Sequence, residues 1–199
     1  MTSKKVPMAC DVLHCASSVE WLECVLADFD KFLLDHAAAE KKASGMAMSM
    51  VSHYPDRPEL VSAMTDLAVE ELTHFREVVR LIQKRQLQLG TDEKDRYVGQ
   101  IRDEIRQGSD IYLLDRLISA AVIEARGAER FGLIAKAVKD PDLQRFYQAI
   151  ARSESRHYAL FIDLAYRYFD RETVDSRWQE FLSMEAEILS ALPIRAALH

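Results

Sequence analysis

Two Glu-x-x-His sequences constrain this chain more than any other feature, Glu71-Leu72-Thr73-His74 and Glu154-Ser155-Arg156-His157. Each lies in a long stretch whose apolar residues recur every three or four positions, the period of an amphipathic helix. Residues three apart lie about 60° apart around a helix, so the glutamate and histidine of each pair point the same way. A lone pair of this kind is commonly a surface ion pair. A buried site needs partner residues from neighbouring helices.

Start and stop signals divide the chain into helices. Ser17-Ser18-Val19-Glu20 has the form of a capping box, and Asp56-Arg57-Pro58-Glu59 offers an aspartate cap before a proline. Gly90 is a stop signal, Gly108 precedes a third start, and Asp140-Pro141 opens a fourth helix. The predicted helices cover residues 18–53, 58–89, 110–138, 141–168 and 171–190, with a crossover that contains a short helix at 91–107.

The lengths of the connections predict the fold. Short turns join the first helix to the second and the third to the fourth, so each pair should form an antiparallel hairpin, and one long connection joins the hairpins. No segment alternates like a strand. We therefore expect an all-α, ferritin-like four-helix bundle of two antiparallel hairpins with a crossover connection and an extra C-terminal helix. The expected divisions are an N-terminal arm at 1–16, one ferritin-like di-iron helical domain at 17–192 and a tail at 193–199.

Hairpin geometry supplies partners for both Glu-x-x-His pairs. In an antiparallel hairpin, residues equidistant from the turn lie at the same height. Counting back across the first turn from Glu71 leads to Glu40, and counting back across the second from Glu154 and His157 leads to the positions around Glu124. The spacing is 31 residues from Glu40 to Glu71 and 30 from Glu124 to Glu154. The sequence thus contains the same set of metal-binding residue types twice.

These acidic residues interrupt apolar stripes, so we expect them to face the core. Glu40, for example, continues a stripe formed by Leu26, Leu33 and Ala47. On the third helix Glu129 is also near the required height, and the 30-residue spacing and the stripe favour Glu124. One turn before Glu40 lies His36, which could support that carboxylate or could be a packed core histidine.

A buried carboxylate needs a partner, because desolvation costs several kcal/mol. Four carboxylates at one height would repel one another, and two divalent cations reverse that penalty. The donor set of carboxylates and imidazoles suits iron, with manganese as the alternative, better than zinc. The predicted ligands, through which the metal centre would act catalytically, are Glu40, Glu71, His74, Glu124, Glu154 and His157.

The ligand types alone leave the reaction open. A paired iron site can use O2 to oxidise a C–H bond, and the same architecture can store iron or handle peroxide. A ferritin-like iron- or peroxide-handling protein is therefore the alternative function, and a metal-free helical interaction module is a third. Rubrerythrin-like proteins carry a C-x-x-C iron domain, and this sequence has no C-x-x-C pair.

Composition sets the remaining expectations. The net charge of −6 argues against nucleic-acid binding over the whole surface but allows a local basic patch. No apolar run is long enough to span a membrane, and the N-terminus does not resemble a secretory signal. The three cysteines, Cys10, Cys15 and Cys24, fit reduced thiols in a cytoplasmic protein. The oligomeric state is not predictable.

Four segments together resemble one enzyme family. They surround the six candidate ligands, and the likeness extends over about residues 15–190. The segments are Leu34-Asp35-His36-Ala37-Ala38-Ala39-Glu40-Lys41-Lys42-Ala43, Glu70-Glu71-Leu72-Thr73-His74-Phe75, Ile123-Glu124-Ala125-Arg126-Gly127-Ala128-Glu129-Arg130-Phe131 and Ser153-Glu154-Ser155-Arg156-His157-Tyr158. The chain resembles the bacterial tRNA hydroxylase family MiaE, and it does not depart from the family pattern at these six positions.

This resemblance implies a substrate and a reaction. The family hydroxylates the isopentenyl group of 2-methylthio-N6-isopentenyladenosine next to the anticodon, with two iron ions, O2 and electrons from an external reductant or donor protein. The partner would be the anticodon loop of tRNA, whose phosphates should meet basic residues. Six residues are candidates for those contacts, and the sequence does not rank them: Lys41, Lys42, Arg126, Arg130, Arg152 and Arg156.

Overall fold

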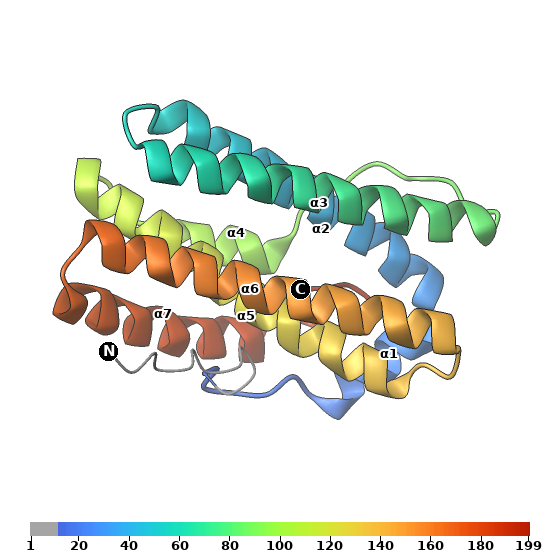
Figure 1. Cartoon of the computed structure of the whole chain (residues 1–199). Helices are drawn as coiled ribbons and strands as arrows, with labels where there is room; N and C mark the ends of the chain where they lie inside the picture. The colour runs from blue at the N-terminus through green and yellow to red at the C-terminus, as the bar shows by residue number, and fades with distance from the viewer. Residues whose placement is uncertain (1–11) are drawn as a thin grey trace, which may run out of the picture. The chain divides into compact units, whose positions relative to one another are not determined.

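A computed structural model describes residues 12–199. The described chain is helical and contains no strand, and none of its helices combines the length and apolarity needed to cross a membrane. Residues 1–11, which include most of the predicted N-terminal arm and Cys10, lie outside the described part. The helices are α1 (Val19–Ala27), α2 (Phe29–His53), α3 (Pro58–Lys84), α4 (Arg96–Asp103), α5 (Ser109–Ala137), α6 (Pro141–Tyr168) and α7 (Arg171–Ala191) (Figure 1).

One compact unit is built on the α2–α3 hairpin and comprises residues 23–94 and 194–198. Apolar residues on the facing sides of the two helices are fully buried, among them Leu33, Ala47, Leu60 and Met64. The segment 194–198 belongs to this unit, since the backbone N–H of Leu198 donates to Asp35 at 2.6 Å. The predicted first hairpin is therefore present.

The other unit contains residues 12–22, 95–193 and 199, and α5 and α6 form its hairpin. Both α4 and α7 pack on α5, and α7 also contacts α6. Nearly every residue in the middle of α5 is buried, as expected for a helix with neighbours on several sides. The second hairpin, the short crossover helix and the additional C-terminal helix agree with the predicted elements, and the bounds of α5, α6 and α7 match to within one residue.

The prediction of one continuous helix over 18–53 is wrong. The chain breaks after Ala27, and Asp28 caps α2 by accepting a hydrogen bond from the backbone N–H of Lys31 at 3.2 Å. This break changes the phase of the apolar pattern. Leu26, which we placed in the core stripe, is 41% exposed, whereas Val25 is buried.

Two predicted caps also differ from the structure. The hydroxyl that accepts from the backbone of α1 belongs to Ser18, not Ser17, and its donor is Trp21 N–H at 3.2 Å. The residue before α3 is Arg57, which has no side-chain capping bond, because the backbone turn from Tyr54 to Arg57 leaves Asp56 within the loop.

The end of α3 comes five residues earlier than predicted. Gln86 adopts a left-handed conformation with φ of 60°. Its N–H bonds to the carbonyl of Gln83, and the N–H of Leu87 bonds to that of Ile82, which is the Schellman arrangement. Glycine usually occupies such a position, so a search for glycine selected Gly90 and missed the true end.

Candidate metal centre

The first buried group of potential ligands, the α2–α3 carboxylate group, consists of Glu40, Glu71 and His74. Glu40 lies in the middle of α2, and the other two are one turn apart on α3. His74 Nδ1 lies 3.3 Å from Glu71 Oε2 and 3.5 Å from Glu40 Oε2. The imidazole therefore contacts a carboxylate on each helix, which agrees with the predicted common height of Glu40 and Glu71.

His36 lies behind this group and supports Glu40. It is fully buried, and its Nε2 lies 2.6 Å from Glu40 Oε1, one turn along α2. Burial, together with the nearby charge of His74, lowers the pKa of His36 to about 3. The ring is therefore neutral at neutral pH and can donate its Nε2–H to the Glu40 carboxylate. Of the two roles left open by the sequence, the structure supports contact with Glu40.

The remaining charges in this group depend strongly on one another. Burial raises the pKa of Glu40 well above its ordinary value, and the neighbouring Glu71 adds to that effect. Burial alone would lower the pKa of His74, but hydrogen bonds to Glu40 and Glu71 outweigh it and raise this pKa to about 10. Two acidic side chains thus compete for one positive partner within the protein, and a bound cation would relieve that competition.

The second group, the α5–α6 carboxylate group, consists of Glu124, Glu154 and His157. His157 Nδ1 lies 3.7 Å from Glu124 Oε2 and 3.9 Å from Glu154 Oε2. The imidazole again lies near one carboxylate from each helix of its hairpin. The order of residue types along the chain is the same as in the first group, so the hairpin geometry inferred from the sequence holds in both.

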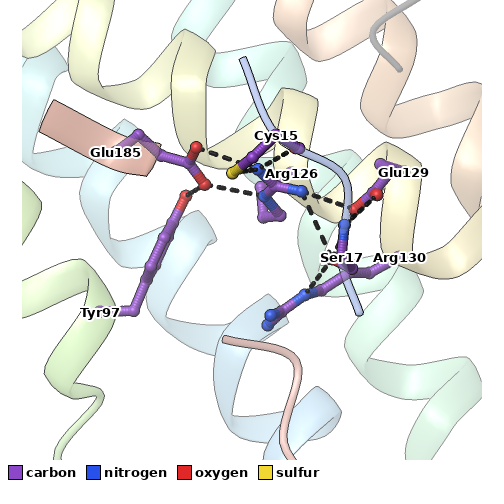
Figure 2. A network of polar contacts seen from close by, with 7 residues as sticks. All are labelled: Cys15, Ser17, Tyr97, Arg126, Glu129, Arg130 and Glu185. Carbon is purple, nitrogen blue, oxygen red and sulfur yellow. Dashed lines mark hydrogen bonds and ion pairs between the residues drawn. The ribbon is translucent and has the colours of Figure 1, made fainter. Parts of the chain in front are cut away.

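Glu129, the alternative to Glu124 as the ligand on α5, belongs to a different cluster of side chains. Its two carboxylate oxygens accept from the backbone N–H and the hydroxyl of Ser17, each at 2.7 Å, and one also accepts from Arg126 Nη1 at 2.8 Å (Figure 2). Arg126 also forms two hydrogen bonds to Glu185 on α7, at 2.7 and 3.0 Å. We call this cluster the Arg126 network: Cys15, Ser17, Tyr97, Arg126, Glu129, Arg130 and Glu185.

The network corrects two of the basic candidates for RNA contact. Arg126 is completely buried, and Arg130 is buried against the ring of Trp21, whose centroid lies 4.4 Å from the guanidinium carbon. Burial, reinforced by the charge of Arg126, lowers the pKa of Arg130 to about 10. Neither guanidinium is accessible to a phosphate.

Lys41 and Lys42 are exposed but engaged within their own unit. Lys41 Nζ lies 2.9 Å from Asp92 Oδ1, and Lys42 Nζ donates to the carbonyl of Glu93 at 2.9 Å. Arg152 and Arg156, the last two candidates, are exposed on α6, where Arg156 contacts the hydroxyl of Ser153. Of the six basic candidates, Arg126 and Arg130 are thus buried, whereas Lys41, Lys42, Arg152 and Arg156 are exposed.

All six predicted ligands are buried, with exposed fractions between 1% and 8%, and all are of metal-binding types. Each hairpin contributes two carboxylates and one imidazole. Hard oxygen donors with imidazole fit iron or manganese, and the absence of thiolate disfavours a structural zinc site. These residues are chemically suited to a pair of divalent cations.

Comparison with known proteins identifies the family. The family model described as tRNA-(MS[2]IO[6]A)-hydroxylase (MiaE) matches residues 4–199. The chain belongs to the MiaE family. A relative from Pseudomonas putida strain KT2440, named tRNA 2-(methylsulfanyl)-N(6)-isopentenyladenosine(37) hydroxylase, is 34% identical over 179 residues, which cover 90% of this chain and 87% of the relative.

Two further comparisons extend this result. A relative of the same name from Salmonella typhimurium strain LT2 is 34% identical over 155 residues, covering 78% of this chain and 56% of the relative, so the match spans only about half of that longer protein. Among solved structures, a Synechococcus protein with aldehyde deformylating oxygenase activity matches with a TM-score of 0.90 and 33% identity, over 94% of this chain and 95% of that one. The MiaE-family chain is thus all-α and ferritin-like, as predicted.

Proposed function

We propose that this protein is an O2-dependent di-iron hydroxylase that acts on the isopentenyl group of 2-methylthio-N6-isopentenyladenosine in tRNA, next to the anticodon. The observation that carries the proposal is the burial, in each hairpin, of two carboxylates and one imidazole. Membership of a tRNA hydroxylase family supports the choice of substrate. An enzyme acting on tRNA would meet its substrate in the cytoplasm, and that location is part of the proposal.

In this proposal the six predicted ligands bind two iron ions, and each hairpin contributes two carboxylates and one imidazole. The six ligands are Glu40, Glu71, His74, Glu124, Glu154 and His157. Iron is preferred to manganese because the proposed reaction uses O2. When bound, the metal pair supplies the redox chemistry that activates O2, with electrons from an external reductant or donor protein.

The protein's own residues would bind, orient and shield this centre. The neutral His36 ring donates to one oxygen of Glu40 and so fixes the direction in which the carboxylate presents its other oxygen. Within the α5–α6 hairpin, buried side chains such as Ala121, Phe131 and Phe161 keep water away from the ligands. An apolar environment also suits the isopentenyl group, whereas the charged tRNA backbone must stay at the surface.

The direct test is nucleoside analysis. The protein is reconstituted with ferrous iron and incubated with reductant, O2 and tRNA that carries the unhydroxylated nucleoside, and the digested tRNA is analysed by mass spectrometry. We expect the nucleoside to gain one oxygen atom, and this atom should derive from isotopically labelled O2. An unchanged nucleoside in the presence of fully metal-loaded protein would contradict the proposal. Large assemblies that accumulate iron without an organic substrate would favour the iron-handling alternative.

A further inference from the structure

The outward face of α6 carries a row of exposed arginines, Arg145, Arg152, Arg156 and Arg167. At 100° per residue these four positions fall within a sector of about 60°, so they lie along one line of the helix surface. Arg152 and Arg156 are one turn apart at its centre. We call this row the α6 arginine strip. Exposed Asp163 lies on the same line between Arg156 and Arg167, so the positive charge is concentrated at Arg152 and Arg156.

This strip is unusual in an acidic protein. The chain has a net charge of −6, and the other exposed charged residues of α6 are only Asp142 and Asp163. Its neighbour in the same unit, α7, is mainly acidic: it exposes Glu172, Asp175, Glu180 and Glu187 and, at its first residue, Arg171. A polyanion approaching this unit would be attracted to α6 and repelled from α7.

The existing contacts of the strip do not prevent a phosphate from binding. Arg145 pairs with Asp142, an ion pair in which both side chains are about three-quarters exposed to solvent, and such exposed pairs are weak. Arg156 Nη2 lies 3.0 Å from the hydroxyl of Ser153, which engages one nitrogen of the guanidinium. A guanidinium carries five N–H donors, so an arginine that contacts protein groups can also bind a phosphate at the surface.

The strip shares its helix with two proposed ligands. Arg152 and Arg156 each lie two residues from Glu154, or about 200° around the helix, so they project from the side opposite to its buried carboxylate. We propose that the α6 arginine strip binds the phosphate backbone of the tRNA substrate, with Arg152 and Arg156 at the centre of the contact. This inference rests on the proposed function and specifies the surface of the protein that the RNA contacts.

The test compares two charge reversals that are identical in chemistry and spacing. Arg152→Glu/Arg156→Glu alters the strip, and Arg76→Glu/Arg80→Glu alters two exposed arginines, also four residues apart, on the outward face of α3. Both double variants shift the net charge by the same amount, so they separate a local contact from a general effect of charge. Binding of labelled tRNA to the iron-loaded proteins is measured by fluorescence anisotropy over a series of salt concentrations.

We expect the α6 variant to bind tRNA at least about tenfold more weakly at near-physiological salt, with the slope of log K against log salt reduced by roughly 1–2 because two phosphate contacts are lost. The α3 variant should keep the wild-type slope. Circular dichroism and metal content should match the wild type in both. If the α6 double variant fails to fold, Arg152→Gln alone should still reduce the slope by about half as much.

Three outcomes would overturn the inference. If the α6 variant binds tRNA with wild-type affinity, the strip is not the contact surface. If both variants lose the same affinity, the effect comes from net charge alone. A loss confined to the α3 variant would place the contact on α3. If any of these occurs while wild-type protein still hydroxylates tRNA, only the assignment of the surface fails. If wild-type protein neither binds nor hydroxylates tRNA, the proposed function fails with it.

Discussion

The Arg126 network and the two carboxylate groups are buried sets of charged side chains that differ in what balances their charge. In the network, Glu129 and Glu185 each accept hydrogen bonds from the guanidinium of Arg126. In the carboxylate groups, each imidazole lies close to two glutamates, as His74 does to Glu40 and Glu71. Buried charge neutralised by arginine indicates a structural role, whereas buried glutamates that share an imidazole indicate a place for a cation.

The largest expected effect is the loss of stability when the Arg126 network loses its arginine. Arg126→Met would leave Glu185 buried without its guanidinium, and removing one member of a buried ion pair costs about 3–5 kcal/mol. Urea unfolding of the metal-free protein measures this loss. The exposed Arg152→Met should change the free energy of unfolding by less than about 0.5 kcal/mol. Equal costs for both variants would show that the network does not stabilise the fold.

Next in size is the contrast between the two glutamates of α5. Glu124→Ala should lower metal affinity by more than about 100-fold, because losing a ligand should exceed the 10–100-fold effect of losing a supporting group. Glu129→Ala should retain the metal and lose about 1–3 kcal/mol of stability, since it strips partners from Ser17 and Arg126. Metal analysis and urea unfolding provide the two measurements. Loss of metal in the Glu129 variant alone would reverse the assignment.

A smaller change in metal affinity should follow from removing the support of Glu40. His36→Leu deletes the hydrogen bond to this carboxylate, and loss of such a group typically lowers metal affinity about 10–100-fold. His36→Gln can still donate a hydrogen bond and should lose less. Competition with a chelator of known affinity gives both values. If the leucine variant binds metal like the wild type, His36 is only a packing residue.

The smallest expected effect is a pH dependence at another neutralised carboxylate, Asp115 on α5. Burial alone would raise its pKa, but hydrogen bonds from Arg106 and Arg177 outweigh this and hold the pKa below the ordinary value of 3.8. A lowered pKa stabilises the fold above the unfolded-state pKa, and this contribution is lost as the pH falls through the folded-state pKa.

The free energy of unfolding of wild-type protein should therefore fall more steeply than that of Asp115→Asn as the pH decreases below about 4. Urea titrations of both metal-free proteins at a series of pH values measure this difference. Parallel curves would mean that the two arginines do not lower the pKa of Asp115 in the folded protein.

Local sequence signals predicted the elements that repeat a simple pattern. Helical periodicity and the Asp140-Pro141 start gave α6 its bounds, and equal distances from a turn paired Glu40 with Glu71. Both inferences depend on geometry within one hairpin. They could therefore be drawn without knowledge of long-range contacts.

The errors arose where long-range contacts or unusual residues decided the outcome. Ser17 resembled a cap for α1, but Glu129, 112 residues away in sequence, accepts both of its donors. Gln86 ends α3 in a conformation that usually requires glycine. Arg126 looked like an RNA contact because its sequence does not reveal the buried Glu185 on α7. In each case the missing information was the identity of a distant partner or a locally strained backbone.

The central claim is that the histidine-bound carboxylates, and not the arginine-bound ones, hold the metal. The most direct measurement is the iron content of wild-type, Glu124→Ala and Glu129→Ala proteins after anaerobic reconstitution and removal of loosely bound metal. We expect two iron ions per chain for wild type and Glu129→Ala, and fewer for Glu124→Ala. Wild-type protein without bound iron, or equal iron in all three proteins, would contradict it.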